Sequence, residues 1–302
     1  MARFLPVVLV VGLLGGSAAA FAVTERLKLE RSPIFGTQVG KVVSCVSGRR
    51  VPIRFRVRKS DSLSLAIVDS NDRVVRALIS SHDVRSGRKK YTWDGCDDAG
   101  NSVPDGIYKP RVHLAGEHRT ILLPNPIAVD TKVPHISLTR TSLEVVSPDG
   151  DAIDDYLTVF FHTSEPARAV LYANGRRVVK VKSFSAHSLK WGKRNGMPTK
   201  PGVYRLWLRS IDAAGNPGPR TPTFRVQIRY IEVGRNVIRA RAGGTINVRV
   251  STDARLYYWR IGPRHGRVGN RRLSLAAGAP GHYQLVVSER GHKARALVVV
   301  SP

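Results

Sequence analysis

The densest group of acidic side chains lies between residues 147 and 156, in the run Ser-Pro-Asp-Gly-Asp-Ala-Ile-Asp-Asp-Tyr. Its four carboxylates belong to Asp149, Asp151, Asp154 and Asp155. A flexible acidic loop can supply the roughly six to eight oxygen ligands that Ca²⁺ takes, although this loop lacks the central glycine and closing glutamate of an EF-hand. The sequence therefore offers a candidate calcium site, and the alternative is a solvated turn in which an aspartate caps a strand.

A second candidate binding region lies near the carboxy terminus and interleaves arginines with aromatic residues. Arg guanidinium groups bind phosphate and carboxylate, and aromatic faces stack on sugars or bases, so the region could bind a polyanion. Alternatively, Tyr257, Trp259 and Ile261 face a core and only the arginines are exposed. The residues of the region are Arg255, Tyr257, Tyr258, Trp259, Arg260, Arg264, Arg267, Arg271 and Arg272.

Motifs of catalysis are missing from the chain. The nine histidines are scattered singly, without His-x-x-x-His spacing, and there is no Gly-x-Ser-x-Gly nucleophile turn. Nucleotide-binding glycine loops are missing as well. We therefore expect no enzyme, and calcium is the one cofactor that the sequence suggests.

The two cysteines, Cys45 and Cys96, each lie in a turn-like stretch of sequence. In an oxidising compartment, a disulfide closing this loop would stabilise the fold by about 4 kcal/mol in the chain-entropy model. Two unrelated thiols are the alternative, because sequence alone does not give the geometry of a pair.

The elements that carry these residues are expected to be β-strands. Residues 51–58 alternate apolar side chains with Arg54, Arg56 and Arg58, which is the pattern of a half-buried strand. Similar runs recur along the chain, separated by turn residues, at 157–161, 204–209, 246–250 and 283–287. The fold class predicted from these runs is all-β, as tandem immunoglobulin-like β-sandwiches following one apolar amino-terminal helix.

Three segments repeat one pattern, ending in Pro-Asp-Gly-Ile-Tyr at 104–108, Pro-Gly-Val-Tyr at 201–204 and Pro-Gly-His-Tyr at 280–283. We expect a basic third module at 230–302 after two β-sandwiches at 24–132 and 133–229, each near the ~100 residues of an immunoglobulin domain. Trp93 and Trp191, upstream of the first two copies, are expected to fill the cores rather than to stack on carbohydrate.

The first copy resembles a known domain. Residues 91–108, Tyr-Thr-Trp-Asp-Gly-Cys-Asp-Asp-Ala-Gly-Asn-Ser-Val-Pro-Asp-Gly-Ile-Tyr, are similar to the signature of the immunoglobulin-like (FlgD-like) domain of flagellar hook-capping proteins and of many bacterial surface proteins. The resemblance covers residues 51–114 and implies an extracytoplasmic structural or adhesive β-sandwich without catalytic residues. The Arg-rich composition with this domain is similar to actinobacterial envelope proteins. The signature residues are Trp93, Asp94, Gly95, Gly100, Pro104, Gly106 and Tyr108.

Residues 4–23 form an uncharged stretch of 20 residues, long enough to cross a bilayer as a helix. We expect residues 1–23 to be a membrane anchor, with the bulk of the chain outside the cell. The alternative is a signal peptide cleaved after Ala20 or Ala22, which would make the protein secreted. Arg26, Lys28 and Arg31 follow the stretch and oppose this orientation under the positive-inside rule.

The chain carries 49 Lys and Arg against 22 Asp and Glu, a formal net charge of +27, and all three modules are basic. Partners are therefore expected to be anionic, and envelope polymers or other envelope proteins are favoured over nucleic acid. The leading hypothesis is a membrane-anchored structural or adhesive protein. The alternatives are a receptor for anionic cell-wall polymer through residues 230–302 and a non-catalytic accessory protein to an envelope enzyme.

Overall fold

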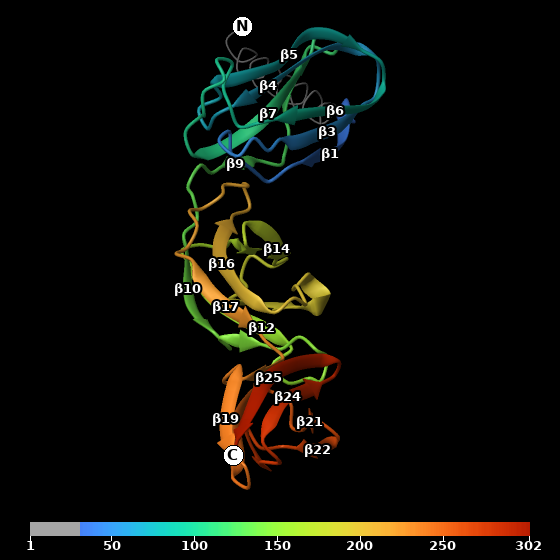
Figure 1. The fold of residues 1–302 in the computed structure, drawn as a ribbon. Helices are drawn as coiled ribbons and strands as arrows, with labels where there is room; N and C mark the ends of the chain where they lie inside the picture. The colour runs from blue at the N-terminus through green and yellow to red at the C-terminus, as the bar shows by residue number, and fades with distance from the viewer. Residues whose placement is uncertain (1–30) are drawn as a thin grey trace, which may run out of the picture. The chain divides into compact units, whose positions relative to one another are not determined.

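The computed structural model describes residues 31–302 (Figure 1). Within that range regular structure consists of β-strands and one turn of 3-10 helix, η1 (Lys193–Asn195), which confirms the predicted all-β class. The predicted apolar helix over residues 4–23 lies outside the described residues. Between residues 31 and 302, no helix is long and apolar enough to cross a membrane. The described residues divide into two compact units, one ending at Thr131 and the other covering Lys132–Pro302.

The first unit contains one sandwich, which we call the first module. Its two sheets have the strand orders β1-β3-β6 and β2-β9-β7-β4-β5, with β8 paired to β7. Buried side chains from both sheets form a single core. The strands are β1 (Ile34–Val39), β2 (Val42–Val43), β3 (Val51–Val57), β4 (Asp61–Val68), β5 (Val74–Val84), β6 (Gly87–Trp93), β7 (Gly106–Leu114), β8 (Arg119–Leu122) and β9 (Ile127–Val129).

The second unit begins with the second module, in which the sheets β10-β12-β15 and β11-β17-β16-β13-β14 enclose a second core. Its strands are β10 (Ile136–Thr141), β11 (Val145–Val146), β12 (Tyr156–Thr163), β13 (Arg168–Ala173), β14 (Arg176–Lys180), β15 (Ser188–Gly192), β16 (Gly202–Ile211) and β17 (Phe224–Ile228).

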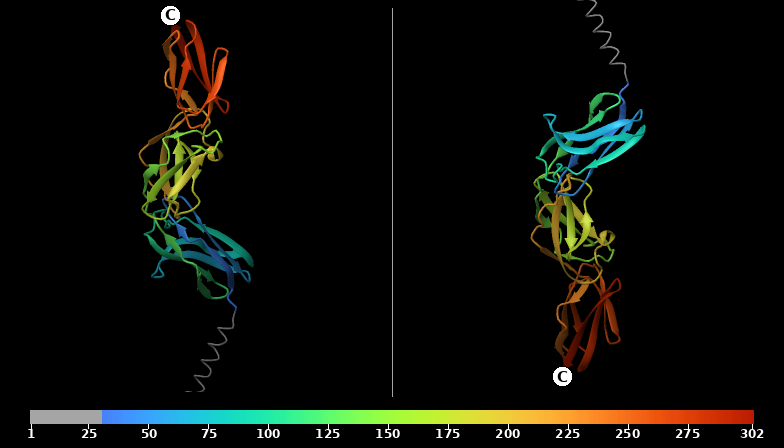
Figure 2. Two further views of the ribbon diagram at one scale, coloured as in Figure 1. Left: turned by 90° about the horizontal axis from the view of Figure 1, so that it is seen from below. Right: turned by 90° about the horizontal axis from the view of Figure 1, so that it is seen from above.

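The third module completes the second unit with the sheets β18-β20-β23 and β19-β25-β24-β21-β22 around a third core. Figure 2 gives two further views of these layers. The strands are β18 (Ile231–Val233), β19 (Val237–Arg241), β20 (Thr245–Thr252), β21 (Tyr257–Ile261), β22 (Arg264–Val268), β23 (Arg272–Ala276), β24 (Gly281–Glu289) and β25 (His292–Ser301).

The three modules share one topology. Each has a three-stranded sheet opposite a five-stranded path of strands, and the strands follow one another in the same sequence order. In each module one pair of strands is parallel, namely β2 with β9, β11 with β17 and β19 with β25, and the other pairs are antiparallel. This repetition confirms tandem immunoglobulin-like sandwiches in the part of the chain that the structure describes.

The predicted alternation is visible in β3. Ile53 and Phe55 are fully buried, whereas Arg54 and Arg56 between them are exposed. Burying one face of such a strand stabilises the sandwich, because each large apolar side chain contributes about 1.5–3 kcal/mol when it leaves water. The alternation therefore decides which face of the strand meets the core.

The repeated tyrosine has one structural role in all three modules. The hydroxyl of Tyr108 donates a hydrogen bond to the Pro104 carbonyl at 2.8 Å. Tyr204 and Tyr283 do the same with the carbonyl four residues earlier, each at 2.9 Å. This is the tyrosine corner of immunoglobulin-like sandwiches, which pins the turn to the strand that follows.

The repeated tryptophan packs against this corner. The ring of Trp93 meets Tyr108 edge-on with centroids 5.5 Å apart, and Trp191 meets Tyr204 at 6.4 Å. Both indoles are buried, which leaves no free face for a sugar. The expected core role therefore accounts for Trp93 and Trp191.

The corner gives a prediction for stability. Tyr108→Phe should lower the free energy of unfolding of the first unit by about 1 kcal/mol, because the buried hydroxyl loses its bond to the Pro104 carbonyl. Calorimetry should show the first unit's midpoint falling by about 5 °C. Tyr283→Phe is the matched control and should cost less, since its hydroxyl bond is exposed. Equal losses of stability in the two variants would contradict the expectation that the more buried hydrogen bond of Tyr108 contributes more than the exposed one of Tyr283.

Candidate metal centre at the junction of two modules

The acidic loop connects β11 to β12, and two of its four aspartates serve the loop itself. The Asp155 carboxylate accepts hydrogen bonds from the backbone N–H groups of Gly150 at 2.6 Å and Ala152 at 2.7 Å. Asp154 has an exposed side chain, and its backbone carbonyl accepts a bond from the N–H of Ser147. These two residues hold the turn in the way that short acidic side chains commonly do.

The other two aspartates keep oxygens available. Asp149 Oδ1 accepts the N–H of Asp151 at 3.1 Å, and Asp151 Oδ1 accepts the N–H of Ile153 at 2.7 Å. The side chain of Asp149 is 0% exposed, yet its Oδ2 has no hydrogen-bond donor. A buried oxygen without a donor is costly, so it marks a place where a partner would be stabilising.

The third module brings two further carboxylates to the same place. Glu289 ends β24 and is only 4% exposed. Its Oε2 accepts the Thr252 hydroxyl at 2.6 Å, while its Oε1 has no donor. Asp253 follows β20, and both of its carboxylate oxygens are buried.

Three of these side chains converge closely enough to share a cation. One carboxylate oxygen from each of Asp149, Asp151 and Glu289 lies within 4.8 Å of the others. Burial, with smaller contributions from contact with the Asp149 carboxylate and from the charge of Asp253, raises the pKa of Glu289 to about 7. Burial, together with repulsion from Asp149 and Asp151, raises the pKa of Asp253 to about 6. The arrangement thus concentrates negative charge.

A cavity of about 150 Å³, lined by the acidic residues Asp154 and Asp253, has room for several water molecules. Both modules line it, with Ser147 and Tyr230 from one side and Thr252 and Asp253 from the other. The buried hydroxyl of Ser147 lies beside the Asp253 carboxylate and limits the rise of its pKa. Oxygen donors from the two modules therefore surround a space that water or a hydrated ion could fill.

The connection between the second and third modules is very short. Tyr230 is buried in the second core, and its neighbour in sequence, Ile231, is buried in the third. The Tyr230 hydroxyl donates to the Thr199 carbonyl at 2.9 Å, and its ring stacks on His292 with centroids 3.5 Å apart. Because β17 and β18 are joined by only two residues, the ends of the two sandwiches are held together and the carboxylates with them.

Sequence reasoning found half of this site. It singled out Asp149 and Asp151 together with Asp154 and Asp155, but it did not include Asp253 or Glu289. One signal was available, because the third module has 13 Arg and Lys but only three acidic residues, and two of those three are Asp253 and Glu289.

The Arg and aromatic region of the third module is mostly solvated. Tyr257 is 1% exposed, and its hydroxyl donates to the Asn270 carbonyl, whereas Tyr258 is 55% exposed with Arg267 over its ring at 5.3 Å. Trp259 is half-buried against the core. The exposed arginines are Arg255, Arg260, Arg264, Arg267, Arg271 and Arg272. The structure thus places one aromatic ring of the region, Tyr258, fully on the arginine-rich surface.

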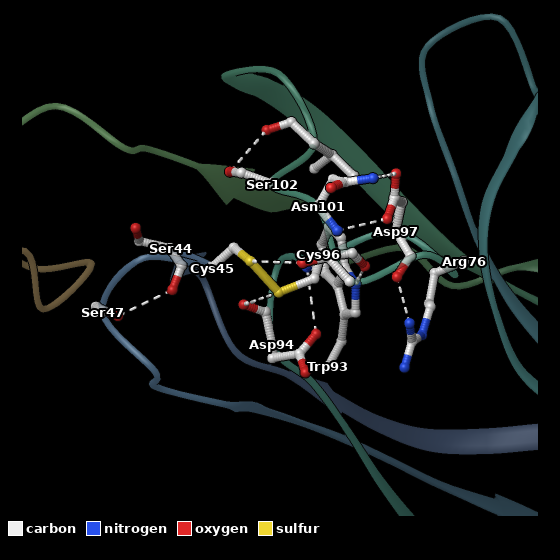
Figure 3. Close-up of a disulfide and its surroundings, with 12 residues drawn as sticks. Ser44, Cys45, Ser47, Arg76, Trp93, Asp94, Cys96, Asp97, Asn101 and Ser102 are labelled. Carbon is white, nitrogen blue, oxygen red and sulfur yellow. Dashed lines mark hydrogen bonds between the residues drawn. A yellow bond between two sulfur atoms is a disulfide. The ribbon is translucent and has the colours of Figure 1, made fainter.

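Cys45 and Cys96 form a disulfide in the first module, which confirms the predicted pair (Figure 3). The bond joins the turn after β2 to the turn after β6. The Trp93 indole N–H donates to the Cys96 carbonyl at 2.9 Å. Gly95 has a φ of +84°, and a Cβ there would lie 3.0 Å from the Cys45 nitrogen, so the Trp-Asp-Gly signature needs its glycine. The Trp-Asp-Gly signature therefore shapes the turn that carries Cys96 and allows it to approach Cys45.

A second group of aspartates lies near this disulfide, and its carboxylates serve ordinary turns. Asp94, Asp97, Asp98 and Asp105 each accept at least one backbone N–H, from Cys96, Asn101, Ala77 and Thr131 respectively. These carboxylates are satisfied by the chain itself. The carboxylates at the junction differ from them because several buried oxygens there have no donor.

Comparison with known proteins identifies the first module. Residues 41–117 match the family described as the FlgD Ig-like domain, and the match includes all seven signature residues from Trp93 to Tyr108. The match falls within the first module and agrees with the resemblance of residues 91–108. No curated protein has a matching sequence.

Solved structures with a similar fold include fibronectin(III)-like modules of Clostridium thermocellum CbhA, at 15% identity and a TM-score of 0.36 over 64% of this chain and 92% of that chain. A structure from a 1.5-MDa bacterial ice-binding adhesin matches at 15% identity and a TM-score of 0.28, covering 90% of this chain and 99% of that one. Three titin Ig domains match at 10% identity, a TM-score of 0.28 and the same coverages.

The disulfide gives a second prediction for stability. Replacing Cys45 and Cys96 together by Ala should lower the free energy of unfolding of the first unit by about 4 kcal/mol in the chain-entropy model, because the bond closes a loop of sequence separation 51. Calorimetry on the full chain checks this. The transition of the second unit is the internal control, since it contains no cysteine. An unchanged first transition would refute the stabilising role.

Proposed function

We propose that this chain is an exported, non-catalytic protein of the bacterial cell envelope, whose Ig-like modules serve a structural or adhesive role. Residues 1–23 would tether it to the membrane, with the three modules outside the cell. Cleavage of that segment would release the same modules as a secreted protein. The FlgD Ig-like domain of residues 41–117 supports the structural or adhesive class.

The observation that carries the proposal is the Cys45–Cys96 disulfide within that domain. Structural disulfides form and persist in oxidising compartments and are rare in the bacterial cytosol. The chain contains two cysteines, and the structure joins both in one bond between two turns. A protein that folds with this disulfide is expected in an oxidising compartment outside the cytoplasm.

Export can be tested in cells that express the full chain. A membrane-impermeant amine-reactive label should react with the protein in intact cells, while a cytosolic marker stays unlabelled. Cys45 and Cys96 should resist alkylation until a reductant is added. Amino-terminal sequencing of the membrane fraction distinguishes the anchor from a cleaved signal. Labelling only after lysis, together with freely reactive thiols, would overturn the proposal.

A receptor for anionic cell-wall polymer is the second candidate, favoured by the charge of the third module. The third module contains 13 Arg and Lys but only three acidic residues, and two of these, Asp253 and Glu289, have buried carboxylate oxygens at the junction. The exposed arginines of the region are therefore left largely without local acidic partners. Such a surface binds polyanions by electrostatic attraction that salt screens.

Retention of the full chain on an anionic wall polysaccharide across a salt series tests this candidate. The variant with Gln at Arg267, Arg271 and Arg272 should elute at markedly lower salt than wild type. The matched control carries Gln at Arg54, Arg56 and Arg88, which are also exposed, on β3 and β6 of the first module. Equal shifts in the two variants would mean that only the background charge binds. Retention that is absent or insensitive to salt would remove the candidate.

A further inference from the structure

We propose that Asp149, Asp151 and Glu289 together bind a divalent cation, with ligand chemistry suited to Ca²⁺, and that this ion couples the second module to the third. The proposal goes beyond the envelope function and does not depend on export, because it concerns contacts within the second unit. It also differs from a calcium site within the acidic loop alone, since one ligand comes from the neighbouring module.

The donor set is the first argument. Ca²⁺ is coordinated by carboxylate, hydroxyl and water oxygens at about 2.3–2.6 Å, so two ligands on opposite sides of it are about 4.8 Å apart. The three carboxylate oxygens lie within 4.8 Å of one another. A surface hollow lined by Asp151 and Glu289 gives water access to the site, so water can complete the coordination. Mg²⁺ needs shorter bonds and a near-ideal octahedron, which makes it the natural competitor.

The unpartnered oxygens are the second argument. Asp149 Oδ2 and Glu289 Oε1 belong to side chains that are 0% and 4% exposed, and neither oxygen has a hydrogen-bond donor. Taking charged carboxylates out of water without compensation costs several kcal/mol. The acidic loop around the disulfide shows no comparable deficit, so the junction differs from an ordinary acidic turn.

The positively charged side chains near the three carboxylates neutralise their negative charge only in part. Arg290 Nε lies 3.9 Å from Asp149 Oδ2, and its side chain is 52% exposed, which makes this a weak ion pair. Arg229 and Arg271 line the cavity beside Asp253, and Arg229 also pairs with Glu232 at 3.5 Å. None of these guanidinium groups donates a hydrogen bond to Glu289 Oε1. The position between the three carboxylates therefore remains the favourable place for a compact cation.

The hairpin of the third module sets the position of Glu289. Residues Arg290 and Gly291 have φ values of 39° and 89°, as expected for the two-residue turn between β24 and β25. His292, opposite Glu289 in the register, stacks on Tyr230. The hairpin is thus fixed against the end of the second module. An ion bound by Glu289 and the two aspartates would bridge the modules a second time, beside the covalent connection.

Calorimetric titration of the full chain, after removal of divalent ions with chelator, tests the site with CaCl₂ as the probe. We expect one Ca²⁺ per chain, with a Kd on the order of 0.1–1 mM, as in extracellular calcium modules. Glu289→Gln and Asp149→Asn should each weaken binding at least tenfold. MgCl₂ should bind more weakly than CaCl₂.

Two matched controls locate the ion. Asp154→Asn removes a carboxylate from the same loop but outside the cluster, and Asp83→Asn removes an exposed one from the first unit. Both should leave Ca²⁺ binding within twofold of wild type. If Glu289→Gln binds Ca²⁺ as wild type does, or if Asp154→Asn weakens binding as much as Asp149→Asn, the ion lies in the loop alone and the proposal is wrong.

Thermal unfolding provides a second measurement that does not depend on the heat of binding. Ca²⁺ at 10 mM should raise the midpoint of the second unit by a few degrees and leave the first unit unchanged. In chelator, Glu289→Gln should be at least as stable as wild type, because it removes repulsion, and this outcome also shows that the variant folds. Wild type with neither heat of binding nor a Ca²⁺-dependent midpoint would overturn the proposal.

Discussion

Two adjacent residues, Tyr230 and Ile231, are buried in different hydrophobic cores, and this single constraint determines what happens at the junction of the second and third modules. A chain that passes from one core to the next without a spacer cannot let the two sandwiches separate freely. The stacking of Tyr230 on His292 adds a contact on the neighbouring hairpin. The polar groups at the facing ends must therefore be satisfied within a small shared space.

That space explains why acidic residues there differ from acidic residues elsewhere in the chain. On an exposed turn a carboxylate finds water or backbone amides, as Asp97 does with Asn101. At the junction, Asp149 and Glu289 are shielded from water and face one another. A strongly basic protein that places carboxylates together in this way concentrates a local negative field, which a divalent cation between them would neutralise better than the largely exposed Arg290 guanidinium group.

The parts of the fold that depend on local sequence could be predicted. Alternation in residues 51–58 specified a half-buried strand, and the repeated tyrosine motif marked a corner that recurs in each sandwich. The sequence context of Cys45 and Cys96 favours a disulfide, but the contact between their two turns depends on the tertiary structure. These features need interactions between residues close in sequence or within one module.

The site could be predicted only in part, because its ligands come from distant parts of the chain. The sequence between residues 147 and 156 does not distinguish Asp155, whose carboxylate accepts two loop amides, from Asp149, whose Oδ2 accepts no hydrogen bond. Glu289 sits in a strand whose sequence carries no metal motif. Its role depends on how one module ends against the next, and no local pattern encodes that.

The most direct test of the account is a crystal structure of the chain grown with CaCl₂, with anomalous scattering used to place the ion. The account predicts one calcium peak within bonding distance of Asp149 and Asp151 on one module and of Glu289 on the other. An ion held by Asp154 and Asp155 alone, or a junction with no ion in which Arg290 contacts Glu289, would contradict it.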